Sequence, residues 1–539
     1  MSENLPNNIH ATFTILNGSL VAQHCLPVLS KTISLLMLVT MDLPIKYLAR
    51  GLALSTLVLS TLSYAKPWIE PTDLHLRADL QLLANAGVIT VPITTYPLMW
   101  DGVINDVRAN SGRAKTAMET DAVRRVTRAF SHSQRSNVKL EAGAASEASR
   151  FQHFGTPTRE KGEVTAGYNN QGDWWAFNVE ATYAYDAQDD EDVRLDGSYI
   201  AAILGNWVVS AGYQQQWYGP GWDTALTMST NARPLASVNI TRHNPEAFDV
   251  PVLEWLGPWT MTTGVGWMDD ERHMEDTLLW TFRGTIKPHP NFEFGVSRAA
   301  QLCGTNSESN IEKSCDLDTW WNMLVGDTNV TSGENPANQL ASVDARWGDT
   351  FRGVPYSLYW ESMGEDAVRL ERFPPFQAKS YLYGADVSYE MIGQSITTFF
   401  EYSETMPTCK GVYNCAYEHG TYKTGYRYQD RVLGSTYDND ANTYALGFIG
   451  FSHQTSHRWK ANIRYLELNK DNSNSNEEYG GGNKVSPNGE DTWNVDFSYL
   501  FPITKGEIEL GAEYSFIQYR DGSSDDNNLA GWANWRYIF

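Results

Sequence analysis

The sequence predicts an all-β transmembrane fold: an 18-stranded antiparallel outer-membrane β-barrel with a small N-terminal helical plug. Three observations point to it. Apolar and polar residues alternate in segments of about ten residues that recur up to Phe539. Trp and Tyr, 19 and 28 in number, lie near the ends of these segments. No apolar run reaches the roughly 18 residues of a spanning helix, so strands that cross a membrane must close into a barrel.

Residues 41–65 predict a signal peptide. Lys46 and Arg50 supply a basic start, residues 51–62 are apolar, and the small residues Ser63 and Ala65 predict cleavage after Ala65. Residues 1–40 do not fit this scheme. We expect that translation starts at Met41 and that residues 1–40 come from a misplaced start codon; a longer leader is the alternative.

Residues 66–136 predict a periplasmic helical segment. Thr72 is expected to cap a helix that ends at Gly87. Three apolar stripes at helical spacing mark three short helices: Leu76, Leu80 and Leu83; Trp100, Val103, Ile104 and Val107; and Val123, Val126 and Phe130. Such helices need a surface to pack on. They form either a separate periplasmic bundle or a plug against one end of the barrel.

Residues 137–539 predict the barrel, because the hydrophobic period changes there from 3.6 to 2. Alternation is clearest in residues 174–185, 459–465, 493–501 and 507–516, and the chain ends with Ala533, Trp535, Tyr537 and Phe539 on one face. A soluble sandwich would alternate similarly. Aromatic strand ends and the repeated spacing favour a barrel with apolar residues facing lipid and polar residues facing the lumen.

The connections give an independent count of the strands. Short ones are expected near 169–173, 205–206, 257–258, 287–291, 347–355, 391–394, 454–458 and 502–506. Long ones are expected near 149–161, 186–193, 216–251, 269–276, 302–338, 364–379, 406–440, 469–490 and 521–528. Nine loops and eight turns give 18 strands. Short turns are periplasmic and long loops extracellular in such barrels, which places the acidic clusters and the cysteines outside.

Four cysteines remain after the leader is removed. Cys303 and Cys315 are 12 residues apart and Cys409 and Cys415 are 6 apart, so we expect each local pair to form a disulfide in an exported chain. A link of this size stabilises by roughly 2–3 kcal/mol. The net charge of −23 argues against nucleic acid as a partner, because phosphates would be repelled.

Signatures of catalysis and cofactor binding are scarce. The sequence contains no Gly-x-Ser-x-Gly elbow, no His-Glu-x-x-His and no phosphate-binding glycine loop. Carboxylates such as Glu507 and Glu509 could form a glycosidase pair, but a polar lumen explains them equally. Acidic loop clusters could hold calcium, and His453 and His457 could hold a metal. We expect neither, and predict no enzyme activity, no cofactor and no metal.

The long loops are rich in aromatic residues, which is unusual for exposed segments. The rings could pack loop against loop and block the barrel mouth, or offer flat faces to sugar rings. The predicted polysaccharide-binding residues are Trp217, Tyr218, Trp222, Arg233, Trp320, Trp321, Tyr417, Tyr422, Tyr426 and Arg427. With Arg346, the arginines Arg233 and Arg427 could supply local positive charge for an acidic glycan.

Several segments in order resemble the Wzi-type capsule assembly proteins, outer-membrane lectins that hold capsular polysaccharide at the cell surface. They are 73–80 (DLHLRADL), 87–89 (GVI), 96–98 (YPL), 216–221 (QWYGPG), 232–234 (ARP), 255–259 (WLGPW), 333–336 (GENP), 338–340 (NQL), 364–366 (GED), 425–426 (GY) and 433–434 (LG). The resemblance covers roughly residues 70–440. It implies an 18-stranded barrel, a periplasmic helical plug and outer loops that close the mouth. The four cysteines and the tyrosine-rich stretch at 413–437 depart from this pattern.

These observations favour a non-enzymatic outer-membrane lectin that binds capsular or exopolysaccharide and helps attach it to the cell surface. The expected partners are surface polysaccharide, outer-membrane lipid and, during insertion, the barrel assembly machinery. The expected location is the outer membrane, with the loops extracellular and the helices periplasmic. A porin or polysaccharide export channel is the alternative, since 18 strands can enclose an aqueous lumen. A surface hydrolase is the third possibility.

Overall fold

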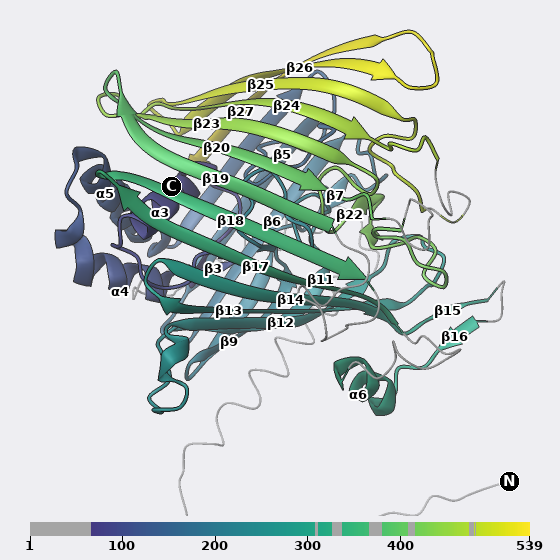
Figure 1. The fold of residues 1–539 in the computed structure, drawn as a ribbon, viewed down its shortest axis with the longest axis horizontal. Coiled ribbons are helices and arrows are strands. Elements are labelled where there is room, and N and C mark those ends of the chain that lie inside the picture. The colour runs from purple at the N-terminus through teal and green to yellow at the C-terminus, as the bar shows by residue number, and fades with distance from the viewer. Residues whose placement is uncertain are drawn as a thin grey trace, which may run out of the picture. The chain divides into compact units, whose positions relative to one another are not determined.

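The computed structural model describes residues 66–307, 311–325, 337–365, 380–407, 415–473, 479 and 481–539. Residues 137–538 of the described chain form one closed antiparallel barrel (Figure 1). Its strands are β4 (Asn137–Ala145), β5 (Gly162–Gln171), β6 (Trp175–Tyr185), β7 (Val193–Arg194), β8 (Tyr199–Leu204), β9 (Trp207–Tyr213), β11 (Ala236–Arg242), β12 (Trp259–Met268), β13 (Thr277–His289), β14 (Phe292–Leu302), β17 (Ala337–Phe351), β18 (Val354–Glu365), β19 (Ser380–Met391), β20 (Gln394–Glu404), β23 (Asn442–Ser452), β24 (Arg458–Leu468), β25 (Glu490–Pro502), β26 (Glu507–Tyr519) and β27 (Asp526–Ile538).

These nineteen segments make 18 strands, because β7 and β8 both pair with β6 and form one interrupted strand. The barrel closes where β27 pairs with β4, and Phe539 and Val138 exchange backbone hydrogen bonds of 3.0 and 2.8 Å beside that seam. The predicted fold class and the role of the final strand in closing the barrel are confirmed.

The two faces of the wall carry opposite chemistry, as the alternation predicts. Trp493, Phe497 and Leu510 are exposed on the outside by 51%, 49% and 48%. Between them, Asn494 and Asp496 are buried on the inside. Unpaired backbone cannot face lipid, and a closed barrel with an apolar outer wall leaves none exposed there. The molecule is therefore built to sit in a bilayer.

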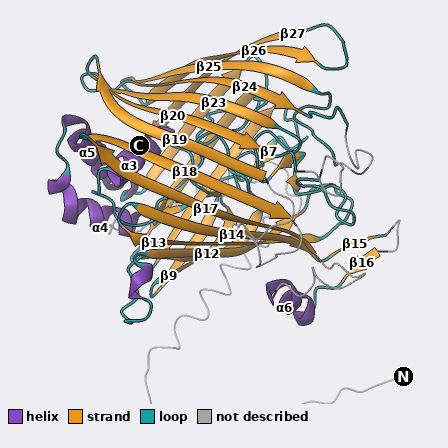
Figure 2. Ribbon diagram, in the orientation of Figure 1, coloured by secondary structure: helices purple, strands orange, loops and turns teal. Residues whose placement is uncertain are grey.

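Three helices cover one end of the barrel, which we call the helix end (Figure 2). They are α3 (Leu74–Asn85), α4 (Trp100–Asn110) and α5 (Ala117–Ser133), followed after α4 by the 3-10 turn η1 (Ser111–Arg113) and accompanied by the short strands β1 (Trp68–Ile69), β2 (Thr95–Tyr96) and β3 (Leu98–Met99). The predicted apolar stripes form their common core. Helix α3 contacts β17, β18 and β23 of the wall, so the segment is a plug. The predicted cap was wrong by one residue: Asp73, which accepts from the Leu76 amide at 2.9 Å, caps α3 in place of Thr72.

One strand, β11, has a different position from the one predicted from the connections. Strand β11 falls inside the expected loop 216–251, and the connection from 243 to 258, which includes the 3-10 turn η2 (Glu254–Leu256), replaces a strand expected before 257. Two errors cancelled in the strand count. Strand β11 is only 7 residues long, with Val238 and Ile240 as its large outward residues. The apolar Val252 and Trp255 of this connection are exposed by 76% and 64%.

The opposite end, the loop end, carries the long connections. They contain β10 (Trp217–Tyr218), β15 (Gly304–Asn306), β16 (Ile311–Lys313), α6 (Leu317–Val325), β21 (Arg427–Tyr428) and β22 (Arg431–Val432). Cys303 and Cys315 form the predicted disulfide beside β15 and β16. Cys409, the predicted partner of Cys415, lies outside the described residues, as do residues 1–65 with the predicted start at Met41 and cleavage at Ala65. Among the described residues, no helix has the length and apolar character to cross a membrane.

Candidate functional site

The barrel lumen is filled by the connection between β9 and β11, residues 214–235, which we call the luminal loop. Residues 217–235 are all buried. Carboxylates of the wall hold its backbone: Glu401 accepts from the amides of Trp222 and Thr224 at 2.7 and 3.0 Å. Gly219 has φ +125°, and a Cβ there would lie 2.7 Å from a Glu361 carboxylate oxygen. The loop therefore follows the inner wall at distances that only glycine allows at this position.

The plug holds the luminal loop from the helix end. Strand β10 of the loop pairs with β2 of the plug. Arg77 of α3 donates to the carbonyl of Pro220 at 3.1 Å, and its guanidinium lies 5.2 and 4.8 Å from the ring centroids of Trp217 and Trp222. Such cation–π contacts are strongest when desolvated, as here. Plug and loop are thus one packed body inside the barrel.

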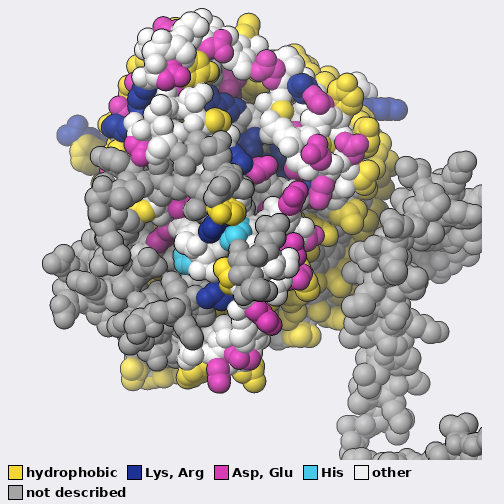
Figure 3. Space-filling model, turned by 90° about the vertical axis from the view of Figure 1, so that its right-hand side faces the viewer, with side chains coloured by type: hydrophobic (Ala, Val, Ile, Leu, Met, Phe, Trp, Pro, Cys, Tyr) yellow, Lys and Arg dark blue, Asp and Glu magenta, His cyan; other side chains and the backbone are white. Residues whose placement is uncertain are grey.

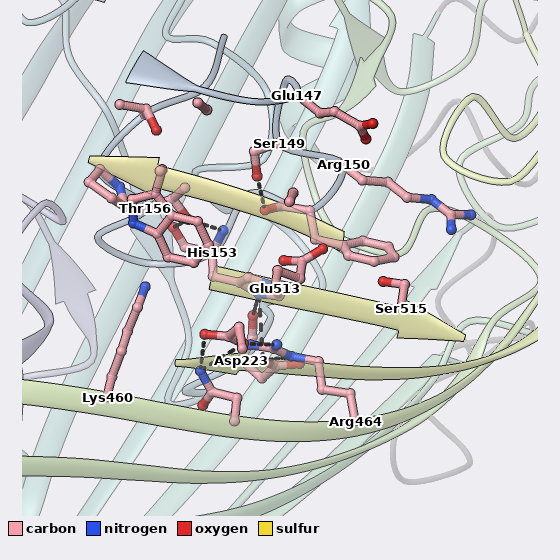
Figure 4. A pocket seen from close by; sticks show the side chains of 18 of the residues that line it. Glu147, Ser149, Arg150, His153, Thr156, Asp223, Lys460, Arg464, Glu513 and Ser515 are labelled. Atoms are coloured by element: carbon pink, nitrogen blue, oxygen red, sulfur yellow. Dashed lines mark hydrogen bonds and ion pairs between the residues drawn. The ribbon is translucent and has the colours of Figure 1, made fainter. Parts of the chain in front are cut away.

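Asp223 anchors the tip of the luminal loop to the opposite wall (Figure 4). Arg464 of β24 donates to Asp223 at 2.8 Å and also bonds Asp496. Tyr437 donates to the same Asp223 carboxylate. His153 Nδ1 lies 2.9 Å from the Asp223 carbonyl oxygen, and burial lowers the pKa of His153 to about 4, so the imidazole is neutral at physiological pH. A cavity of ≈ 90 Å³ lies beside this cluster, which we call the luminal cavity.

A second layer of loop, residues 415–441, lies over the luminal loop. The hydroxyls of Tyr417 and Tyr426 donate to the carbonyls of Leu226 and Thr227 at 2.7 and 3.0 Å. Arg427 bonds Asp438 at 2.6 Å and pairs with Glu418 at 2.7 Å. The two layers close the mouth of the barrel by direct packing.

Most of the predicted polysaccharide-binding residues belong to this packing. Trp217, Tyr218, Trp222, Tyr417, Tyr422, Tyr426 and Arg427 are each no more than 2% exposed. Of the two predicted tryptophans of α6, Trp320 packs against a cluster beside the disulfide, whereas Trp321 is 65% exposed. Arg346 is buried and donates to Asn85 of the plug. The buried rings join loop to loop, and their faces are not open to a sugar in this structure.

A polar pocket of ≈ 470 Å³ opens at the loop end, and we call it the arginine pocket. Its basic lining residues are Arg150, Arg159, Arg233, Arg431 and Lys484, and its acidic ones are Glu147, Glu160, Asp189 and Asp430. Figure 3, which faces this end, shows basic side chains with acidic ones around them. Glu147 and Arg150 line both this pocket and the luminal cavity, so the two adjoin. The volume lies in the range typical of small-molecule sites.

Most charges of the arginine pocket are neutralised within the protein. Arg233 pairs with Asp189 at 2.7 Å, and also with Glu191 and Asp196. These partners raise the pKa of Arg233 against the effect of burial. Glu160 pairs with Arg194 at 2.9 Å, and Lys484 lies 3.7 Å from Asp430. Of the predicted site residues, only Arg233 lines this pocket.

The sequence analysis missed Arg150, Arg159 and Arg431. The first two lie in the connection 146–161, where no aromatic cluster or charge run draws attention to them. Arg431 lies within the tyrosine-rich stretch at 413–437 but was not singled out. Only the folding together of three loops makes these side chains neighbours, so the sequence offered no local signal for them.

Comparisons with known proteins agree with this architecture. The family model for the capsule assembly protein Wzi matches residues 131–529. An uncharacterised 55.8 kDa protein of the cps region of Klebsiella pneumoniae is 24% identical over 460 residues, which cover 84% of this chain and 86% of that protein. The structure of Escherichia coli Wzi, described as an outer-membrane, carbohydrate-binding β-barrel involved in group 1 capsule assembly, matches with a TM-score of 0.73 and 21% identity. That match covers 89% of this chain and all of the other.

Proposed function

The chain belongs to the family of Wzi capsule assembly proteins, and from this premise we propose that it is a non-enzymatic outer-membrane lectin. It binds capsular or exopolysaccharide at its loop end and attaches the polymer to the cell surface. In this proposal the loop end is extracellular and the helix end periplasmic. The barrel assembly machinery inserts the chain, and outer-membrane lipid surrounds it.

One observation carries the proposal: the lumen is filled while a polar pocket remains open at the loop end. The luminal loop and residues 415–441 bury each other across the mouth, and the arginine pocket of ≈ 470 Å³ lies among the loops. A closed barrel with a pocket at one end suits holding a polymer better than passing one. The E. coli relative, whose description names carbohydrate binding, supports the same role.

The predicted site residues have two different roles in this proposal. Trp321 is exposed at the loop end, and Arg233, although largely buried, lines the arginine pocket, so we propose both as contact residues. The buried aromatic residues act indirectly, because they fix the loops whose surface forms the pocket. Replacing Trp321 by Ala is then expected to weaken glycan binding, while the barrel keeps its unfolding behaviour.

A pair of assays on cells and purified protein tests the lectin role. Deletion of the gene is expected to shift polysaccharide from the cell-attached to the shed fraction, and the purified protein is expected to retain capsule from the producing strain on a column. An outer-membrane porin of similar size serves as the control. Retention no greater than that of the porin would disprove the lectin proposal. Shortened glycan chains after incubation would instead indicate a hydrolase.

A porin or export channel is the second candidate, favoured only by the polar inner wall. Planar-bilayer conductance distinguishes it from the lectin. The intact protein is expected to pass little current, because the luminal loop and the plug fill the lumen. Deletion of residues 220–229, which contact the wall through Trp222 and Leu226, is expected to raise the conductance. A large current through the intact protein would favour the channel.

A further inference from the structure

We propose that Arg159 and Arg431 bind a carboxylate group of an acidic sugar in the arginine pocket. This inference rests on the proposed lectin function and adds to it the chemical class of the ligand. The net charge of −23 predicts poor binding of anionic polymers by the molecule as a whole. A local site with unneutralised positive charge is therefore needed, and these two residues supply it.

The first step is that both guanidinium groups bind only neutral acceptors. Arg159 donates to the carbonyls of Asn231 and Thr230, at 2.7 and 3.0 Å. Arg431 donates to the carbonyls of Arg150 and Ser149 at 2.6 and 3.0 Å, and to the Gln188 side-chain oxygen at 2.6 Å. Neither forms an ion pair with any carboxylate of the described residues. Each guanidinium carries five donors, so donors remain for a ligand.

The second step is that the nearby carboxylates are already committed. Asp189 bonds Arg233 and Arg194, and Glu160 bonds Arg194. Of the other two acidic residues of the pocket, Asp430 lies 3.7 Å from Lys484, and Glu147 accepts from the neutral Asn528 amide at 2.6 Å. The pairing leaves Arg159 and Arg431 as the cations of the pocket with no acidic partner among the described residues. An anion that enters the pocket meets these two groups.

The third step is electrostatic. Burial, and after it repulsion from Arg431, lowers the pKa of Arg159 to about 10. Burial is also the main reason that the pKa of Arg431 is lowered. Two like charges that disfavour each other in a partly buried pocket gain stability when an anion binds between them. Guanidinium and carboxylate groups also match in shape and form paired hydrogen bonds, which makes carboxylated sugars a suitable ligand class.

The fourth step is the position of the pair at a junction of three loops. Arg159 belongs to residues 146–161 and holds the luminal loop through residues 230–231. Arg431 belongs to residues 415–441 and holds residues 149–150 of the first loop. A ligand bound here touches the segments that close the barrel. The sugar units beyond the first can extend across the open face of the pocket.

Binding of tetragalacturonate, compared with its carboxyl-reduced neutral counterpart, tests the inference. We expect the purified protein to bind the uronate at least about tenfold more tightly than the neutral oligomer, since hydrogen bonds to charged groups are the strong ones. The double variant Arg159→Gln/Arg431→Gln should lose this preference, and Arg159→Lys/Arg431→Lys should keep part of it. Added salt should weaken the uronate complex.

The matched control is Arg352→Gln, which removes the same charge from the exposed turn between β17 and β18 at the helix end. The electrophoretic mobility of unheated samples, compared with heated ones, shows whether each variant keeps its folded barrel. Equal binding of the two oligomers, or uronate binding unchanged in a folded Arg159→Gln/Arg431→Gln variant, would overturn the inference. Binding of inorganic phosphate by the protein, with no binding of tetragalacturonate, would also overturn the inference in favour of a phosphorylated ligand. Capsule retention tests the lectin role separately, because a neutral glycan can bind while the uronate does not.

Discussion

The lumen and the arginine pocket both contain arginines, but they use them differently. In the lumen, Arg464 is 3% exposed and bonds two carboxylates, Asp223 and Asp496. In the pocket, Arg159 and Arg431 are partly exposed and bond only carbonyl and amide oxygens. A buried charge needs compensation, whereas a charge that water still reaches needs less. Arg464 obtains it from carboxylates, and the buried Arg77 obtains it from a carbonyl and ring faces.

The largest expected effect comes from breaking a luminal pair. Arg464→Gln leaves Asp223 and Asp496 buried without their cation, and we expect it to lower the free energy of unfolding by about 3–5 kcal/mol. Tryptophan fluorescence during denaturant unfolding measures this loss. The matched variant Arg431→Gln, in the pocket, is expected to cost less, about 1.5–3 kcal/mol, since it removes hydrogen bonds of a charged group but leaves no buried carboxylate without its cation. Equal losses from both would remove the contrast between the two regions.

A smaller effect is expected from Tyr437→Phe. The Tyr437 hydroxyl is buried and donates to Asp223. In the variant, Asp223 still accepts from Arg464. Loss of one hydrogen bond to a charged group should lower the free energy of unfolding by about 1.5–3 kcal/mol. Tyr402→Phe is the control, because the Tyr402 hydroxyl bonds Glu404 in a less buried place. A loss in Tyr437→Phe no larger than in the control would mean that Asp223 does not need this donor.

The smallest effect is a dependence of loop packing on pH. Burial raises the pKa of both Glu418 and Asp440 to about 7, from ordinary values of 4.5 and 3.8. The folded loop then binds more protons than the unfolded one between these values, so its stability is full below about pH 4 and falls as the pH rises through about 7. We expect hydrogen exchange in residues 415–441, corrected for the intrinsic rate, to be slower at about pH 5 than at about pH 8.

Two variants sharpen this result. Glu418→Gln and Asp440→Asn remove the titrating groups, so the exchange of the double variant should depend less on pH. Residues 146–161 carry His153, whose pKa burial lowers from 6.5 to about 4. The unfolded segment therefore binds more protons than the folded one between these values, so its exchange should become slower as the pH rises from about 5 to 8, opposite to residues 415–441. Faster exchange of residues 415–441 at the lower pH in the unmodified protein would contradict the assigned direction.

The wall could be predicted from local pattern because each strand meets lipid on one side and the lumen on the other. Val179 and Tyr183 are exposed by more than half, while Asn178 and Glu180, the two neighbours of Val179, are buried. The count of 18 strands came from the connections between them, and two errors in that count cancelled. The exception is β11, which has few outward apolar residues, so the hydrophobic pattern could not be distinguished there from a loop.

The binding residues could not be predicted in the same way. Aromatic density correctly marked the loops that close the mouth, but it did not tell packing from exposure: Trp217 is fully buried and Trp321 is 65% exposed. The disulfide between Cys303 and Cys315 was predictable because its two residues are close in sequence. The pocket required contacts between distant loops, such as that of Arg159 with Asn231, 72 residues away.

The sequence by itself determined a membrane barrel with a capped end. The period of two in the strands and the apolar stripes of the helices are local properties, because each strand or helix must match lipid, water or a packed core on its own faces. Only the tertiary structure decided that the lumen is filled and which cations lack an acidic partner. Arg464 and Asp223 are 241 residues apart. Whether a charge is neutralised depends on which distant segments fold against it, and no local spacing records that.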